Sequence, residues 1–167
     1  SGNLAITASS VTNDAANSRI ISNGGISLNS VSALNNAGVI SAASLLTLTG
    51  ANLTNSGTLA SRSGKVDIDS SGTLTNSGII SGATAVDLDV RTLNNASGTV
   101  QSDGTVAVTV NSLSVGQIYG RDLLLSSNNS IALQNGELLS ASRNLQLNSN
   151  GNITNSGNII ASGTLNV

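Results

Sequence analysis

Short aliphatic pairs, in which two aliphatic residues flank one other residue, recur along the whole chain. Successive pairs begin 17 to 22 residues apart, most of them 20 residues apart. Because side chains alternate between the two faces of a strand, each pair predicts a short strand with one buried face. The nine pairs are Leu4/Ile6, Ile26/Leu28, Leu46/Leu48, Val66/Ile68, Val86/Leu88, Val106/Val108, Leu123/Leu125, Leu145/Leu147 and Leu165/Val167.

Two further phases lie between successive pairs. The first reads aliphatic residue, any residue, Asn and then Gly, as in residues 53–57 and 74–78, both LTNSG. The second is a single aliphatic residue after that Gly, such as Leu59 or Ile80. Each unit of about 20 residues therefore predicts three short strands joined by three corners.

A fixed repeat length decides how these strands pair. Every strand needs neighbours for its backbone groups, and with a constant step the neighbour is the same strand of the next unit. The sequence therefore predicts an all-β fold, a parallel β-helix of about eight coils, as one repeat segment over residues 1–167. A helix bundle is excluded, because Ser, Thr, Asn, Gly and Val are poor helix formers and no helical apolar stripe persists.

The composition narrows the possible functions. Charged residues are 8% of the chain, aromatic residues 1%, and Pro, Cys, His and Met are absent. Without Cys or His there is no thiolate or imidazole chemistry and no zinc or disulfide framework, so we expect no cofactor and no enzyme activity. The net charge of −2 and the short apolar runs argue against nucleic-acid binding and against membrane insertion. The absence of Met indicates a fragment of a longer chain.

The recurring Asn suggests a structural role at one corner. Stacked amides can each donate to one neighbour and accept from the other, which satisfies polar groups inside a narrow tube. We predict such a ladder, broken where one coil carries Val115 in place of Asn. Its predicted members are Asn36, Asn55, Asn76, Asn95, Asn135 and Asn155.

Four acidic residues form the first candidate for surface chemistry. The 20-residue step places Asp87 beside Asp67 and Asp89 beside Asp69, all pointing outward. Such carboxylates could bind Ca²⁺ weakly, or resemble the acid pairs of β-helical polysaccharide enzymes. We favour a simpler interpretation, in which solvent screens the patch and Lys65, Arg62 and Arg91 partly neutralise it.

The shortest coil, within residues 111–130, provides the second candidate. It contains the only Tyr, Tyr119, close to Arg121. Ile118 should point inward and Tyr119 outward, where an exposed Tyr beside Arg could form a contact point. The simpler interpretation is a shortened corner without a binding role. A Ser/Lys catalytic pair at Ser63 and Lys65 is not favoured.

Three segments of the chain are especially alike: residues 34–49 (LNNAGVISAASLLTLT), 53–68 (LTNSGTLASRSGKVDI) and 74–90 (LTNSGIISGATAVDLDV). These segments resemble the repeats of filamentous haemagglutinin, and the resemblance extends from about residue 11 to 167. They are equally similar to the repeats of CdiA-type exoproteins of contact-dependent inhibition. The resemblance implies a right-handed helix and export by an outer-membrane two-partner secretion transporter. It also implies a location at the surface of a Gram-negative cell. Neither the family's secretion domain nor a toxin-like segment is recognisable.

We therefore expect a structural shaft segment of a cell-surface filament that projects a distal functional region. In this interpretation, any receptor on a host or target cell binds other regions of the parent protein. One alternative is an adhesive module whose rod face binds a glycan or receptor, which would group long outward side chains on one sheet. A more remote alternative is a carbohydrate-active β-helix enzyme, which would need a deep groove lined by Asp and Arg.

Overall fold

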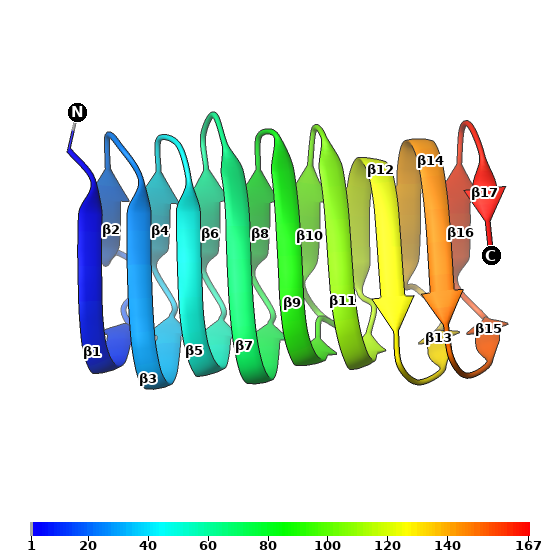
Figure 1. Cartoon of the computed structure of the whole chain (residues 1–167), viewed down its shortest axis with the longest axis horizontal. Helices are drawn as coiled ribbons and strands as arrows, with labels where there is room; N and C mark the ends of the chain where they lie inside the picture. Colours follow the sequence, from blue (N-terminus) through cyan, green and yellow to red (C-terminus); the bar gives the residue numbers. More distant parts are fainter. Residues whose placement is uncertain (1) are drawn as a thin grey trace.

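The computed structural model describes residues 2–167, which form a rod of stacked coils with the two ends of the chain at opposite ends of the rod (Figure 1). All strands pair in parallel, and each strand lies beside its counterpart in the next coil. Within these residues there is no helix, and hence none that could span a membrane. The predicted parallel β-helix is confirmed.

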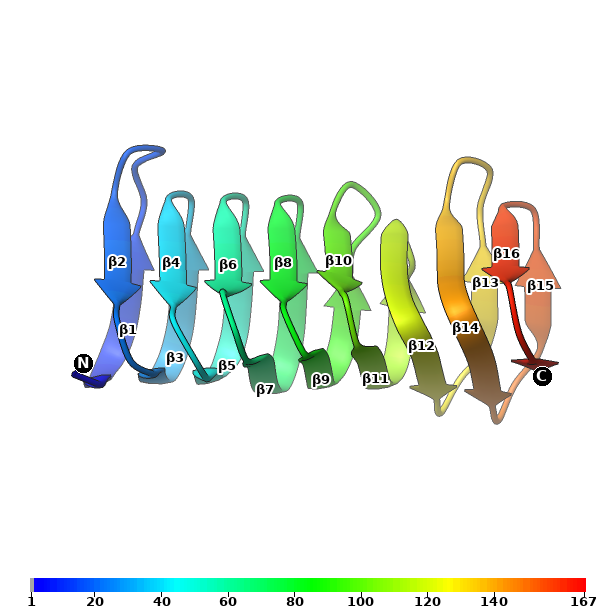
Figure 2. The same ribbon diagram turned by 90° about the horizontal axis from the view of Figure 1, so that it is seen from above.

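The coils are numbered 1 to 8 by the aliphatic pair that opens each, at Leu4, Ile26, Leu46, Val66, Val86, Val106, Leu123 and Leu145. Each coil has three faces. Face 1 carries the aliphatic pair, face 2 the aliphatic-x-Asn motif, and face 3 the single aliphatic residue that follows. Seen from above, the strands of face 3 lie side by side along the whole rod (Figure 2).

In coils 1 to 6, one long strand covers faces 1 and 2. These strands are β1 (Leu4–Asn13), β3 (Ile26–Asn36), β5 (Leu46–Asn55), β7 (Lys65–Asn76), β9 (Ala85–Asn94) and β11 (Thr105–Ser114). The short strands of face 3 are β2 (Arg19–Ser22), β4 (Val39–Ala42), β6 (Thr58–Ser61), β8 (Ile79–Gly82), β10 (Thr99–Ser102) and, in coil 8, β16 (Asn158–Ala161).

The last coils divide the same three faces differently. There, β12 (Gln117–Ser127) and β14 (Leu138–Ser149) each run from face 3 into face 1 of the next coil. Face 2 is formed by β13 (Ile131–Leu133) and β15 (Ile153–Asn155), and β17 (Leu165–Asn166) ends the rod. The three predicted faces are present, but two of the three predicted strands merge in most coils. They merge because the chain bends with only a local shift of register, for example between Ser70 and Thr73.

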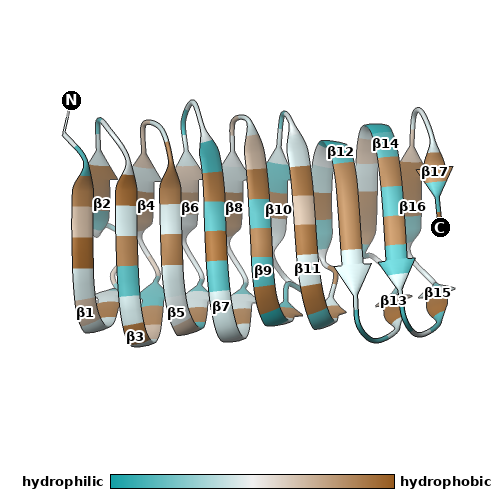
Figure 3. Cartoon of the chain, in the orientation of Figure 1, coloured by the Kyte–Doolittle hydropathy of each residue, from teal (hydrophilic) through white to brown (hydrophobic). Residues whose placement is uncertain are grey.

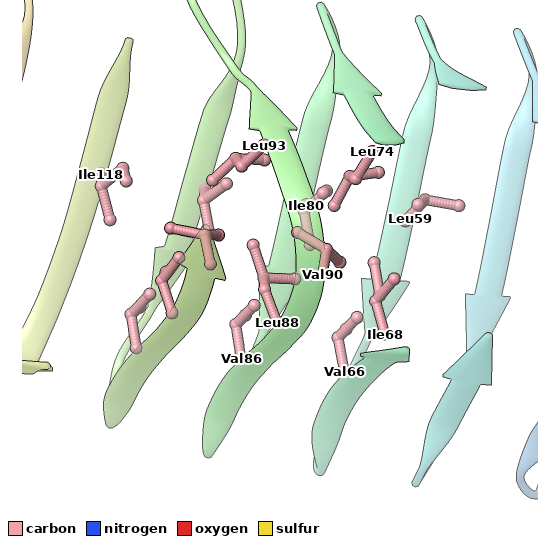
Figure 4. Packing of buried hydrophobic residues seen from close by; sticks show 14 of the residues in the cluster. Leu59, Val66, Ile68, Leu74, Ile80, Val86, Leu88, Val90, Leu93 and Ile118 are labelled. Carbon is pink, nitrogen blue, oxygen red and sulfur yellow. The ribbon is translucent and has the colours of Figure 1, made fainter. Parts of the chain in front are cut away.

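The core is a single column of aliphatic side chains along the rod. Figure 4 shows Val66, Ile68, Val86 and Leu88 of face 1 pointing toward Ile80 of face 3. All buried apolar residues are Val, Ile, Leu or Ala. The tube therefore has room for aliphatic side chains but not for stacked rings, which accounts for the near absence of aromatic residues.

The aliphatic pairs stack in one register over all eight steps. Leu46 lies beside Val66 and Ile68 beside Leu88, and the same alignment continues to Leu145 and Leu165. Hydrophobic and hydrophilic bands accordingly lie at matching heights on neighbouring strands (Figure 3). The repeat positions therefore predicted the strand register correctly.

Buried serines stabilise several corners. The hydroxyl oxygen of Ser102 accepts a hydrogen bond from the backbone N–H of Gly104 (3.0 Å), and that of Ser22 does the same for Gly24 (3.0 Å). A Ser two residues before a Gly is therefore a corner signal in this sequence.

Candidate functional site: an asparagine ladder and two charged clusters

The buried corner after face 2 holds a continuous ladder of side-chain amides. The Nδ2 of each Asn donates to the Oδ1 of the Asn in the next coil, over 2.7 Å from Asn36 to Asn55, 2.8 Å from Asn55 to Asn76 and 2.7 Å from Asn76 to Asn95. Asn13 adds a further rung, because its Nδ2 donates to Asn36 over 2.7 Å. Five coils thus share one chain of hydrogen bonds.

The ladder ends where the sequence indicated. In the coil after Asn95, the side chain at the ladder position belongs to Val115, which is fully buried. The Nδ2 of Asn95 therefore donates to the backbone carbonyl of Val115 (2.6 Å). A main-chain acceptor replaces the missing amide, so the last rung stays satisfied.

Two predicted members lie outside the ladder, and their assignment was wrong. Leu133 and Asn155 are in register, so in coil 7 Leu133 occupies the ladder position. Asn135 lies two residues later, on an exposed turn. Ile131, Leu133 and Asn135 are each two residues apart and so lie on the same face of an extended chain. The sequence pattern therefore fits Leu133 and Asn135 equally well at the ladder position. Asn155 faces Leu133, which cannot pair with an amide, and its Oδ1 accepts from the backbone N–H of Gly157 instead (3.0 Å).

Glu137 is a buried residue that the sequence analysis missed. Its carboxylate lies just beyond the end of the ladder and accepts three backbone N–H groups. Oε1 accepts from Val115 and Gly116 (both 3.0 Å), and Oε2 accepts from Gln134 (2.8 Å). Glu137 thus joins coils 6 and 7 where no amide pair can do so. The signal available in the sequence was that Glu137 is the only Glu of the chain and directly follows Gly136. In the structure, Gly136 forms a turn with φ of +88°.

The acidic patch forms as predicted on the outer surface of face 1. Asp67 lies beside Asp87 and Asp69 beside Asp89 on strands β7 and β9. The Lys65 ammonium bridges the first pair, at 3.2 Å from Asp67 and 2.7 Å from Asp87. These contacts, above all the hydrogen bond to Asp87, raise the pKa of Lys65.

Within residues 2–167, no ion pair neutralises the second pair of the patch, Asp69 and Asp89. Partial burial raises the pKa of Asp69, and the neighbouring Asp67 and Asp89 carboxylates add to the effect. Arg62, which we expected to help neutralise the patch, instead donates to the backbone carbonyl of Ser22 (3.2 Å). Among residues 2–167, no cluster of three or more acidic side chains is arranged to hold a metal ion.

Calcium titration followed by calorimetry should show no binding tighter than about millimolar, the weak end of extracellular calcium sites. Lys65 already occupies the space between Asp67 and Asp87, and four carboxylates on a flat sheet supply too few ligands in one place. Micromolar affinity that is lost in the Asp67→Ala/Asp87→Ala double variant would contradict this expectation.

The side chains of the short coil point in the expected directions, but Tyr119 and Arg121 do not form the expected contact point. Ile118 is buried, and Tyr119 is 36% exposed with its hydroxyl donating to Gln117 (2.8 Å). The stronger charge contact lies one coil further, where Nε of Arg143 donates to Oδ1 of Asp122 (2.7 Å). That contact lowers the pKa of Asp122. Arg121 lies 3.7 Å from the same carboxylate, and within residues 2–167 no hydrogen bond joins it to Tyr119.

The family comparison agrees with this architecture. The sequence profile of the haemagglutinin repeat matches residues 1–78, 60–135 and 120–167, and so covers the whole chain in three overlapping sections. No curated protein and no solved structure gives a significant match. The family is one of structural and adhesin proteins rather than of enzymes. The chain, a parallel β-helix with an internal asparagine ladder, belongs to the haemagglutinin repeat family.

Proposed function

We propose that the chain is a shaft segment of a secreted filamentous exoprotein and that its role is mechanical. The observation that carries this proposal is the single aliphatic core that runs through all eight coils without interruption. Each strand pairs only with its counterparts in the adjacent coils, which makes such a stack a stiff, quasi-one-dimensional rod. With a spacing of about 4.8 Å, eight coils add about 40 Å to a filament.

The wider setting belongs to the same proposal. The parent filament would leave the cell through an outer-membrane two-partner secretion transporter and project a distal region from a Gram-negative surface. A chain without Cys suits this route, because disulfides formed in the periplasm would block the threading of an unfolded chain. Coil-by-coil folding outside the cell needs no ATP. A shaft of this kind serves an adhesin and a contact-dependent inhibition stalk equally well.

The distribution of long side chains supports the shaft over an adhesive rod face. Arg19 lies on face 3, Lys65 on face 1 and Arg91 at the corner between faces 1 and 2. The other three cationic residues, Arg62, Arg121 and Arg143, lie at the corner between faces 3 and 1, so no single sheet gathers the long side chains. An adhesive face would concentrate such side chains on one sheet. The remaining outward positions are mostly Ser, Thr and Asn, which suit a solvated surface.

Two measurements on the purified chain test this proposal. Small-angle X-ray scattering should show a monomeric rod, and added erythrocytes or glycan arrays should show no binding above background. Agglutination or saturable glycan binding would instead favour the adhesive module. A scattering profile typical of a flexible coil would contradict the shaft directly.

A further inference from the structure

The chain contains three Asn-Gly pairs, and the Asn side chain of each pair is exposed. In such a pair the backbone nitrogen of Gly can attack the side-chain amide of Asn and close a succinimide ring, because Gly has no Cβ to obstruct the approach. The reaction needs no enzyme and no cofactor, so the structure around each pair decides where it takes place. The pairs are Asn23-Gly24, Asn135-Gly136 and Asn150-Gly151.

A corner serine holds the attacking nitrogen in two of the three pairs. The N–H of Gly24 donates to the hydroxyl of Ser22 (3.0 Å), and the N–H of Gly151 donates to that of Ser149 (3.2 Å). Both glycines also pack against the preceding coil, and a Cβ added to Gly151 would lie 2.6 Å from Ser130. Each of these corners must therefore break a hydrogen bond and move out of contact before it can react.

The third pair, Asn135-Gly136, has neither restraint. Position 134 is Gln where the other two corners have Ser, and within residues 2–167 the N–H of Gly136 donates to no acceptor. A Cβ added to Gly136 would meet no atom within 4 Å, so no neighbouring coil packs on this glycine. The turn joins β13 to β14 at the edge of the rod (Figure 2). Its attacking nitrogen is thus free and its surroundings are open.

We propose that Asn135 is a site of spontaneous covalent modification. The Gly136 nitrogen loses its proton and attacks Cγ of Asn135. As the new C–N bond forms, the bond from Cγ to Nδ2 breaks, and the amide nitrogen takes up a proton and leaves as ammonia. Water then opens the succinimide at one of its two carbonyl groups. One product is Asp at position 135, and the other is isoaspartate, which makes the main chain one methylene longer.

The modification reaches the joint between coils 6 and 7 through Glu137. The same turn positions this side chain, because the N–H of Gln134 donates to its Oε2 (2.8 Å). Its Oε1 accepts from Val115 and Gly116 of coil 6 (both 3.0 Å). A longer main chain at Asn135 displaces Glu137 from these two N–H groups, and a new carboxylate in the turn repels the carboxylate of Glu137. Modification therefore loosens the contact between the two coils.

Peptide mapping tests the site, because trypsin places the three pairs in different peptides, residues 20–62, 122–143 and 144–167. The folded chain is kept in mildly alkaline buffer, and fragment ions in mass spectrometry locate each deamidated residue. Asn135 should react about five to ten times faster than Asn23 and Asn150, which is the factor that one hydrogen bond provides. In urea, where the corners are unfolded, the three pairs should react at similar rates. Equal rates in the folded chain, or a slower Asn135, would overturn the proposal.

The Ser149→Ala variant is the matched control for this experiment. It frees the N–H of Gly151 and leaves the turn at Asn135 untouched. Asn150 should then react about five to ten times faster than in the natural chain, whereas Asn135 should keep its rate. An unchanged rate at Asn150 would also overturn the proposal, since a free N–H would then not be what singles out Asn135.

Hydrogen exchange measured by NMR tests the effect on the joint. After modification, the amides of Val115 and Gly116 should exchange faster by about tenfold or more, because each loses a charged acceptor. The amide of Leu74, in the middle of the rod, should be unaffected. The Asn135→Ala variant cannot form the ring, so it should show no change after the same incubation. Unchanged protection of Val115 and Gly116 in fully modified chains would show that the proposed effect on the joint is wrong.

Discussion

Replacing Asn76 by Ala should destabilise the chain by about 2–5 kcal/mol, because a buried rung disappears from the middle of the ladder. Its Nδ2 donates to Oδ1 of Asn95, and its Oδ1 accepts from Nδ2 of Asn55. In the Asn76→Ala variant, Oδ1 of Asn95 loses its amide donor and Nδ2 of Asn55 loses its shortest acceptor. Each buried polar group left without a partner costs about 1–3 kcal/mol.

Two matched asparagines serve as controls for this experiment. Asn13→Ala removes only the terminal rung, a single amide-to-amide bond of 2.7 Å, and should cost about half as much. Asn135→Ala changes an exposed turn residue outside the ladder and should cost less than about 0.5 kcal/mol. Urea denaturation of the three variants measures the difference. Equal, small losses would mean that Asn is selected for its turn preference alone.

Glu137→Gln should cost about 2–4 kcal/mol, although it changes the volume of the side chain very little. The carboxylate offers two oxygens to three backbone N–H groups, from Val115, Gly116 and Gln134. Glutamine offers one oxygen and directs an NH₂ group at donors. At least one buried N–H group therefore loses its acceptor, and a hydrogen bond to a charged group is also lost.

The exposed Asp103→Asn provides the control, because it makes a similar chemical change without a buried contact. It should alter the free energy of unfolding by less than about 0.5 kcal/mol. Hydrogen exchange should place the destabilisation by Glu137→Gln at the junction of coils 6 and 7. A Glu137→Gln variant as stable as Asp103→Asn would show that the three hydrogen bonds contribute little.

The repeat alone was sufficient to predict the fold and its register. A step of about 20 residues leaves each strand only one equivalent neighbour, so Val66 had to lie beside Val86 and Asp67 beside Asp87. The same reasoning placed Asn36, Asn55, Asn76 and Asn95 on one line. In regular coils, the position of a residue in the sequence is therefore also its position in space.

The tertiary structure decided what happens where the repeat becomes irregular. In coil 7, whether Leu133 or Asn135 takes the ladder position depends on how the chain turns after β13, and the period-two pattern fits both. The role of Glu137 depends on three N–H groups that come from two different coils. These arrangements depend on contacts between coils of unequal length, which a repeat period does not encode.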